Sequence, residues 1–184
     1  MTIIVWRGDE MCCDTGVWAS DYVTTHETMD KVIRLPDGSL LGSAGEVWAI
    51  QVHAEWARAG FPEDKKPEPP ENRDAFGAIL VTPNGDAFLI DHKFHREKLD
   101  SPFAAEGSHG EFAYACLLAG CSAAETVALA IKHTSHCAGR VVTHRLVPED
   151  EAQAEPPEPT IDDVLDDELP IAEPAPGSRE FYGL

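Results

Sequence analysis

Thr2 is the first residue of this sequence whose side chain could carry out covalent chemistry. It opens the apolar segment 2–6, and removal of Met1, which is efficient before small residues, makes Thr2 the N-terminal residue. Its hydroxyl group then shares one residue with a free α-amine that can accept the hydroxyl proton. Such a residue is a nucleophile with its own general base. Because threonine is also common in β-strands, this interpretation depends on the residues placed near Thr2.

Asp14 is the first candidate for such a neighbour. The segments 2–7 and 10–15 alternate in polarity around Arg7-Gly8-Asp9, which predicts a β-hairpin. A three-residue loop at 8–10 pairs Asp14 with Ile4 and makes it a diagonal neighbour of Thr2, about 7–8 Å away. A shift of one residue in this register reverses the face on which Asp14 lies.

Lys31 and Gly42 belong to a second predicted hairpin, in which the segments 31–35 and 39–44 flank the turn at 36–38. Its register places Lys31 opposite Ser43 and beside Gly42. A lysine close to the threonine hydroxyl favours its deprotonation, and an aspartate keeps that lysine charged and oriented. A glycine N–H group can stabilise the oxyanion of an acyl-transfer reaction.

Ser108 supplies a further hydroxyl group at a predicted junction between a strand and a helix. The sequence 107–110 is Gly-Ser-His-Gly, and a serine there can either point toward a site or cap the helix. The two roles are compatible with each other.

The elements that must position these residues follow from periodicity and turn signals. Asn84-Gly85 predicts a hairpin turn, Ser122 and Glu125 form a capping box, and Gly60 and Gly120 fit helix ends. We predict strands at 2–7, 10–15, 31–35, 39–44, 76–82, 86–91 and 139–147, and helices at 45–60, 108–120 and 122–133. Hairpins followed by a late pair of helices predict an α+β fold, in which antiparallel sheets are covered by helices.

The chain resembles the proteasome β-subunit family of N-terminal nucleophile (Ntn) hydrolases, and in particular its HslV-like members. The resemblance lies in the segments 2–5, 13–17, 31–35, 42–45 and 107–110, which occur in the family's order and at close to its spacing. Together they span about residues 2–147. Each segment alone is weak, whereas the ordered set is specific.

This resemblance implies an αββα sandwich of two antiparallel sheets between helical layers, with subunits assembled into closed rings. It implies hydrolysis of peptide bonds through an acyl-enzyme ester on Thr2, whose α-amine is the base. Asp14 and Lys31 would be the charge pair that tunes Thr2, the Gly42 N–H would be the oxyanion donor, and Ser108 would be an auxiliary hydroxyl near the amine. No metal or cofactor is implied. Short members of the family occur in bacteriophage and prophage genomes, so a phage origin is one interpretation.

Two features depart from the family's pattern. Only the segment 61–73, with four prolines, fits between the first helix and the next strand, so the second helix of one layer is missing. The family often has an Asp and a Ser or Thr before the last strand, where this chain has Thr134 and Cys137. His136 is the one nearby substitute for the missing acid. These departures reduce one helical layer and leave ring assembly and activity as open questions.

Composition limits the partners and the location of the protein. The net charge is −19, of which −11 lies in residues 148–184, a segment with twelve acidic residues, one basic residue and seven of the fourteen prolines. No basic stripe is present, which argues against nucleic acid and against anionic membranes as partners. We therefore expect an Ntn-hydrolase domain at 1–147 and an acidic tail at 148–184. The tail is either solvated or folds on a partner such as an ATPase.

Neither a signal peptide nor a membrane-spanning segment is predicted, and the five cysteines form no CxxC pair. These features favour a cytoplasmic protein with reduced thiols, in a bacterial host if the gene belongs to a phage. His92, His95, His133 and His136 have spacings that a metal could use. No Cys or carboxylate set completes a ligand shell around them, so we predict no metal site.

The leading hypothesis is a threonine endopeptidase that acts on polypeptides as a homo-oligomer. One alternative is a catalytically inactive structural or assembly protein with the same fold, and retention of Met1 would favour it by blocking the amine of Thr2. Another alternative is an amidase for a small amide, because Ntn chemistry is shared between the two classes.

Overall fold

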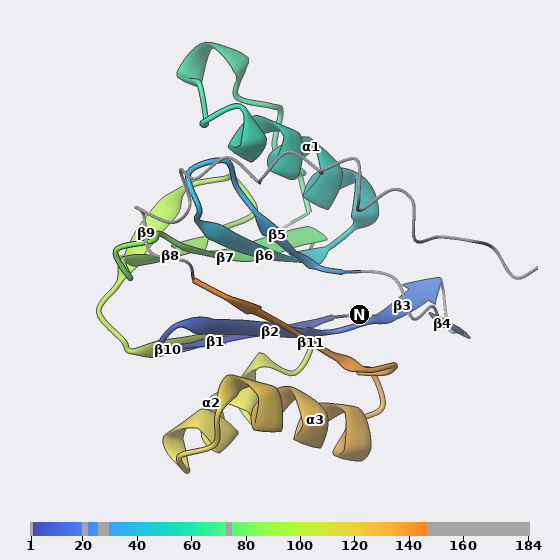
Figure 1. Cartoon of the computed structure of the whole chain (residues 1–184). Helices are drawn as coiled ribbons and strands as arrows, with labels where there is room; N and C mark the ends of the chain where they lie inside the picture. The colour runs from blue at the N-terminus through green and yellow to red at the C-terminus, as the bar shows by residue number, and fades with distance from the viewer. Residues whose placement is uncertain (1, 20–21, 26–29, 73–74, 147–184) are drawn as a thin grey trace, which may run out of the picture. The chain divides into compact units, whose positions relative to one another are not determined.

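The computed structural model describes residues 2–19, 22–25, 30–72 and 75–146. These residues form two β-sheets stacked face to face, with helix α1 on one outer face and helices α2 and α3 on the other (Figure 1). The α+β class and the αββα sandwich are therefore confirmed. The acidic tail expected at 148–184 lies outside the described residues.

The first sheet has the strand order β10-β1-β2-β11, and its neighbouring strands are antiparallel. It consists of β1 (Ile3–Arg7), β2 (Glu10–Asp14), β10 (Phe103–Gly107) and β11 (Val141–Arg145). Side chains alternate along β1, so that Ile4 and Trp6 face the second sheet while Ile3 and Val5 face α2 and α3.

The turn of the first hairpin is one residue shorter than expected. Arg7 pairs with Glu10, and Ile4 pairs with Cys13 rather than with Asp14. Gly8 has a φ angle of 62°, which suits the first position of a two-residue type II′ turn. The prediction that Asp14 lies opposite Ile4 was wrong, because the two-residue loop shifts the register and places Asp14 opposite Ile3.

The second sheet has the strand order β5-β6-β7-β8-β9 and is antiparallel throughout. It consists of β5 (Val32–Arg34), β6 (Leu40–Gly45), β7 (Phe76–Val81), β8 (Ala87–Ile90) and β9 (Arg96–Leu99). Val32 pairs with Gly42, and the Ser43 N–H donates to the Lys31 carbonyl at 3.0 Å, which confirms the predicted register of this hairpin. A separate two-stranded ladder joins β3 (Gly16–Ala19) to β4 (Tyr22–Thr25).

Helix α1 (Val47–Arg58) covers the second sheet, and Gly60, whose φ angle is 80°, follows its C-cap residue Ala59. Between α1 and β7 the described residues contain one short 3-10 turn, η1 (Glu63–Lys65), and no second α-helix. The expected reduction of this layer is thus seen in the described part of the chain.

Helices α2 (Gly110–Leu118) and α3 (Ala123–His133) cover the first sheet (Figure 1). The Ser122 side chain accepts from the Glu125 N–H at 3.2 Å, and Glu125 accepts from the Ser122 N–H at 2.8 Å, so the predicted capping box is present. None of the helices within the described ranges is long and apolar enough to cross a membrane.

Three apolar clusters hold the layers together. One lies between the sheets and includes Ile4, Met11 and Ile79; one lies beneath α1, around Trp56; and one lies beneath α2 and α3, around Leu117. Burial of an Ile, Leu or Met side chain stabilises a fold by about 1.5–3 kcal/mol. The inter-sheet cluster fixes the distance between the sheets, and the candidate site lies at the edge of this space.

Candidate active site

Thr2 lies immediately before β1 and is buried, with 7% of its surface exposed. Its carbonyl oxygen accepts a hydrogen bond of 3.0 Å from the Ser108 N–H, so the β1–β10 pairing continues to these two residues. Gly107 has a φ angle of 107°, and a Cβ atom at this position would fall on the Thr2 carbonyl group. Glycine is therefore required for the close approach that brings Ser108 beside Thr2.

Asp14 and Lys31 form a buried ion pair next to Thr2. The Lys31 Nζ atom lies 2.7 Å from Asp14 Oδ1, and the two side chains are 3% and 0% exposed. Lys31 also donates to the Gly16 carbonyl at 2.6 Å. The same Asp14 oxygen accepts from the N–H group of Ile3 at 3.0 Å, which ties the pair to the residue that follows Thr2.

The one-residue shift in the first hairpin does not separate Asp14 from the Thr2 segment. Because Asp14 lies opposite Ile3, its carboxylate meets the Ile3 backbone instead of the face on which the Thr2 side chain lies. Its second oxygen accepts from the Ala138 N–H at 3.2 Å. Three segments that are distant in sequence thus meet at one carboxylate.

Gly42 occupies a different environment from the one its expected role requires. The Ser43 N–H points to the Lys31 carbonyl, on the β5 side of β6, and the Glu46 N–H points to the Ala75 carbonyl, on the β7 side. Successive N–H groups along an antiparallel strand point to opposite sides. The Gly42 N–H therefore faces β7. A Cβ atom on Gly42 would collide with Ile4 and Met11 in the inter-sheet core, so this glycine serves close sheet packing. The geometry does not support the oxyanion role that the resemblance implies for Gly42.

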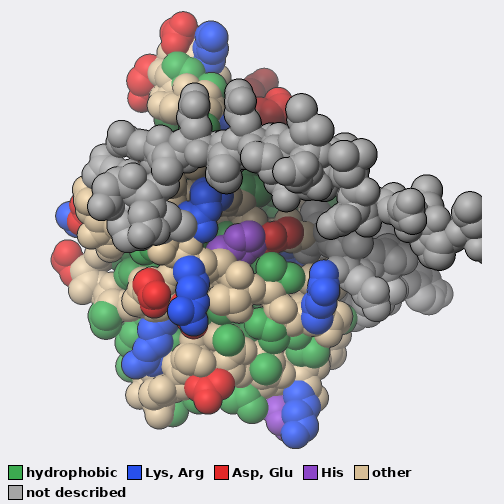
Figure 2. Space-filling view, viewed as in Figure 1, with side chains coloured by type: hydrophobic (Ala, Val, Ile, Leu, Met, Phe, Trp, Pro, Cys, Tyr) green, Lys and Arg blue, Asp and Glu red, His purple; other side chains and the backbone are tan. Residues whose placement is uncertain are grey.

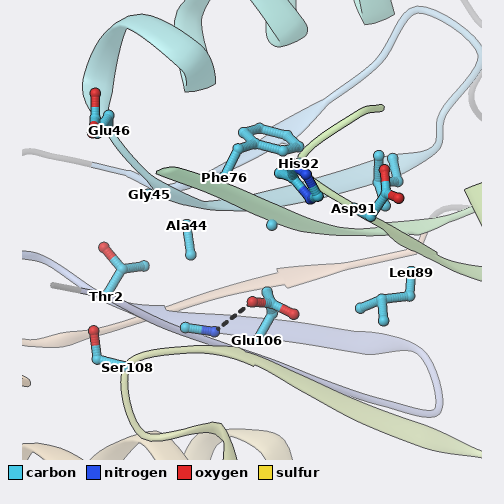
Figure 3. A pocket seen from close by; sticks show the side chains of 13 residues that line it. Thr2, Ala44, Gly45, Glu46, Phe76, Leu89, Asp91, His92, Glu106 and Ser108 are labelled. Carbon is cyan, nitrogen blue, oxygen red and sulfur yellow. Dashed lines mark hydrogen bonds between the residues drawn. The ribbon is translucent and has the colours of Figure 1, made fainter. Parts of the chain in front are cut away.

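The Ser108 hydroxyl points toward the Thr2 side chain in Figure 3. Ser108 is not the N-cap of α2, because the helix begins at Gly110 with His109 as its N-cap. The interpretation of Ser108 as an ordinary helix cap was wrong, since α2 starts two residues later than predicted. Its hydroxyl is available to the site instead.

The loop before β11 brings a thiol toward the ion pair. Cys137 is buried, and burial raises the pKa of its thiol, while Asp14 and Lys31 are close enough to act on it with opposite signs. The Thr134 hydroxyl donates to the Ala130 carbonyl at 2.7 Å. The His136 ring stacks on His109, with the ring centroids 5.3 Å apart. This loop therefore contributes a thiol and an imidazole where a carboxylate was expected.

A cavity of about 620 Å³ opens between the two sheets beside Thr2. Figure 3 shows Thr2 and Ser108 at one end of it, Glu106 at its base, and Phe76, His92 and Asp91 across from them. Its complete lining is Thr2, Ala44, Gly45, Glu46, Phe76, Gly77, Leu89, Ile90, Asp91, His92, Glu106, Gly107 and Ser108. The volume lies within the range of ligand pockets, about 300–1,000 Å³.

Glu106 and the Gly45 amide were not predicted as site groups from the sequence. Glu106 is half-buried in the cavity, and burial raises the pKa of its carboxyl group while a hydrogen bond from the Gly107 N–H lowers it. A detectable signal was an acidic residue directly before Gly107-Ser108, in a segment that otherwise carries Ala104 and Ala105. Gly45 lines the cavity, and its N–H lies on the same side of β6 as the Ser43 N–H.

No group of three or more metal-ligating side chains is present within the described residues. His95 contacts Asp91 at 3.3 Å, and His136 contacts His109 at 3.3 Å. The groups gathered in and beside the cavity are the Thr2 and Ser108 hydroxyls, the Asp14–Lys31 ion pair, the Glu106 carboxylate and backbone amides.

Solved structures share this fold. HslV from Trypanosoma brucei aligns with a TM-score of 0.59 and 19% identity, over 78% of this chain and 97% of the other. The structure named BPH, from Thiobacillus denitrificans, aligns with a TM-score of 0.56 and 17% identity, over 80% of this chain and 98% of the other. No protein-family model matches the sequence, and no curated protein matches it. At these identities the likeness establishes the fold of the chain.

Proposed function

We propose that this protein is a proteasome-like threonine peptidase, which hydrolyses peptide bonds with Thr2 after removal of Met1. The observation that carries the proposal is the buried Asp14–Lys31 pair, joined to the Ile3 amide next to Thr2, with Ser108 on the other side. A buried ion pair is costly to assemble. Its position beside Thr2, the residue immediately before β1, is explained if the pair supports chemistry at Thr2.

In this mechanism the free α-amine of Thr2 accepts the hydroxyl proton while Oγ1 attacks the carbonyl carbon of the substrate. The tetrahedral intermediate collapses to an ester on Thr2, and the leaving amine takes the proton from the α-ammonium group. Water then attacks the ester with the same α-amine as base, which restores the hydroxyl group. The positive charge of Lys31 stabilises the negative charge that develops at Oγ1.

The Gly45 N–H is the best-placed oxyanion donor in this proposal. It lies on the Lys31 side of β6 and at the cavity that Thr2 lines, whereas the Gly42 N–H faces β7. Gly45 has a φ angle of 128°, and a Cβ atom there would overlap the Ala75 carbonyl group. A side chain at this position would displace the amide from the cavity.

The test combines intact mass with covalent labelling. We expect the purified protein to lack Met1, and we expect a peptide epoxyketone to label the wild type but not Thr2→Ala. Retention of Met1, or equal labelling of the two proteins, would refute the nucleophile assignment. Cleavage of small amides without cleavage of peptides would instead favour an amidase.

A catalytically inactive structural or assembly protein is the second candidate. One observation favours it: the loop before β11 brings Cys137 and His136 to the site region in place of the acid and hydroxyl that active relatives often have there. Epoxyketone labelling separates the two candidates, because Met1 is removed before Thr2 whether or not the protein is active, whereas only an active site reacts with the probe.

We further propose that the active form is a cytoplasmic homo-oligomer, and that residues 148–184 bind a protein partner such as an ATPase. The charge of −11 in this segment and its terminal Phe181-Tyr182 support a docking role. Deletion of residues 148–184 should weaken partner binding. An unchanged set of partners and an unchanged assembly would contradict the docking role.

A further inference from the structure

Glu106 is placed next to the proposed nucleophile by strand pairing. It lies opposite Ile4 in the β1–β10 ladder, and the next position on the same face joins Thr2 to Ser108. Glu106 and Thr2 are therefore diagonal neighbours on the face that looks toward the second sheet, about 7–8 Å apart at the backbone. Both line the same cavity.

A carboxylate is an unusual choice for this face. Two neighbours of Glu106 on it are apolar, Ile4 opposite and Ala104 two residues earlier, and both belong to the inter-sheet core. A charged group that is partly removed from water is costly unless it is paired or serves a ligand. An apolar residue at position 106 would continue the core.

The only hydrogen bond of the Glu106 side chain to another described residue is local. Its Oε1 atom accepts from the Gly107 N–H at 3.1 Å, and no described Lys, Arg or His forms an ion pair with it. The other acidic side chains that line the cavity are engaged elsewhere. Glu46 accepts from the Trp48 indole, and Asp91 accepts from the N–H groups of Lys93 and His95. Glu106 is thus the acid left for an incoming group.

The opposite sheet makes room for this carboxylate. Gly77 of β7 lies across the cavity, and a Cβ atom on it would be 2.5 Å from Glu106 Oε1. The absence of a side chain at Gly77 therefore leaves room for the carboxylate, and both residues line the cavity. Figure 3 shows the Glu106 side chain directed from the base of the cavity toward the second sheet, between Thr2 and Leu89.

A local structural role does not account for the charge. The hydrogen bond to the Gly107 N–H needs only an acceptor oxygen, and a neutral glutamine would supply one. A negative charge strengthens the interaction further only when the partner is positively charged, since hydrogen bonds between ionised groups are stronger.

We propose that Glu106 is a specificity-determining residue, whose carboxylate binds the guanidinium or ammonium group of an arginine or lysine side chain of the substrate. Peptides with a basic residue close to the cleaved bond are then the preferred substrates. This inference rests on the proposed function, because it takes the cavity beside Thr2 as the substrate site. It assigns the substrate class to that site.

Binding tests the inference without turnover. The probes are acetylated alanine hexapeptides in which one arginine is moved through each position, together with a series that carries citrulline, the neutral analogue of the same shape. Titration calorimetry uses the full chain as Thr2→Ala. We expect the best arginine peptide to bind about tenfold or more tightly than its citrulline counterpart.

The variants E106Q and E55Q, each combined with Thr2→Ala, locate this preference. Glu55 is an exposed acid on α1, away from the cavity, so E55Q removes the same charge without touching the site. We expect E106Q to bind both series alike and E55Q to keep the preference. Equal binding of the two series by Thr2→Ala alone, no binding of either, or a preference that survives in E106Q would overturn the proposal. If E106Q fails to fold, the comparison of arginine and citrulline peptides binding to Thr2→Ala alone tests the proposal.

Digestion of the same peptides by the wild-type protein separates the proposed role of Glu106 from the proposed peptidase activity. Cleavage that requires Thr2 but ignores arginine would overturn the role of Glu106 and leave the peptidase standing. An arginine preference in binding without any cleavage would overturn the peptidase and leave a cation-binding cavity at Glu106.

Discussion

At the scale of single residues, one carboxylate organises the candidate site. Asp14 accepts hydrogen bonds from Lys31 and from the N–H groups of Ile3 and Ala138, which belong to three different segments. Removing one member of a buried ion pair leaves an uncompensated charge, which costs far more than the pair contributes in net stability. The pair is therefore sensitive to substitution at either member.

Lys31→Met should unfold at a markedly lower urea concentration than the wild type. The expected loss of unfolding free energy is about 3–5 kcal/mol, because Asp14 stays buried without its cation. Lys98→Met is the matched control, since the bond between Lys98 and Asp86 has the same length of 2.7 Å but joins side chains that are 59% and 51% exposed. The control should shift the urea midpoint little. Equal shifts in the two variants would contradict the role given to the buried pair.

His53 predicts a pH dependence of stability. It is fully buried, neither ring nitrogen has a hydrogen-bond partner among the described residues, and Phe76 and Phe94 pack around it. Burial lowers the pKa of His53 from 6.5 to about 4. The unfolded chain thus takes up a proton at a higher pH than the folded chain. The stability due to neutral His53 is fully present above pH 6.5 and is lost as the pH falls toward 4.

The loss due to His53 amounts to roughly 3 kcal/mol between these pH values. It should disappear in His53→Leu, so that the unfolding free energy of this variant declines less on acidification. His133→Gln is the control, because His133 is exposed in the last turn of α3 and should leave the pH dependence unchanged. Identical acid profiles of the wild type and His53→Leu would show that another group causes the decline.

At the scale of elements, local hairpins were easier to predict than the strands that join distant segments. The register of the Lys31–Ser43 hairpin followed from a recognisable turn, and the capping box of Ser122 fixed the start of α3. The first hairpin was displaced by one residue because Gly8 permits a two-residue loop, which residue types alone do not distinguish from a longer one.

The pairing of β10 with β1 joins segments about a hundred residues apart, and no local pattern encodes it. The strands β9 and β10 were not predicted individually, since Arg96–Leu99 is largely exposed and polar. This long-range pairing places Glu106 beside Thr2, so the acid could not be assigned to the site before the fold was known. The proximity of Ser108 to Thr2 was expected only from the resemblance, and its catalytic role stays a prediction.

Gly107→Ala tests whether the end of β10 positions the Thr2 segment. Its φ angle of 107° is costly for alanine by about 1–3 kcal/mol, and the new Cβ would also displace the Thr2 carbonyl group. Gly85→Ala is the control, because Gly85 also has a positive φ angle, 83°, but open space around its α-carbon. We expect both variants to lose stability and Gly107→Ala alone to lose epoxyketone labelling. Normal labelling of Gly107→Ala would show that this contact does not position Thr2.

At the scale of the whole molecule, charge and apolar surface have separate roles. On the face shown in Figure 2, Lys and Arg side chains of the described residues are interspersed with acidic and apolar ones and form no stripe. The sequence as a whole carries a net charge of −19. The large apolar side chains that are exposed in the described residues lie on helices: Val47, Trp48, Tyr114 and Leu118.

These exposed side chains predict self-association through the helical layers. Leu118 is 65% exposed and Tyr114 is 46% exposed, and they lie one turn apart on α2. A charge introduced at the centre of an apolar contact opposes association. At a side chain that is exposed in the monomer, the same charge leaves the stability of the monomer unchanged. Leu118→Glu should therefore sediment as a smaller species than the wild type at micromolar concentration, with an unchanged thermal midpoint.

Ala128→Glu places the same charge on an exposed position of α3 and should leave the assembly intact. A wild type that is already monomeric in analytical ultracentrifugation, or a Leu118→Glu variant with an unchanged sedimentation coefficient, would rule out α2 as the contact surface.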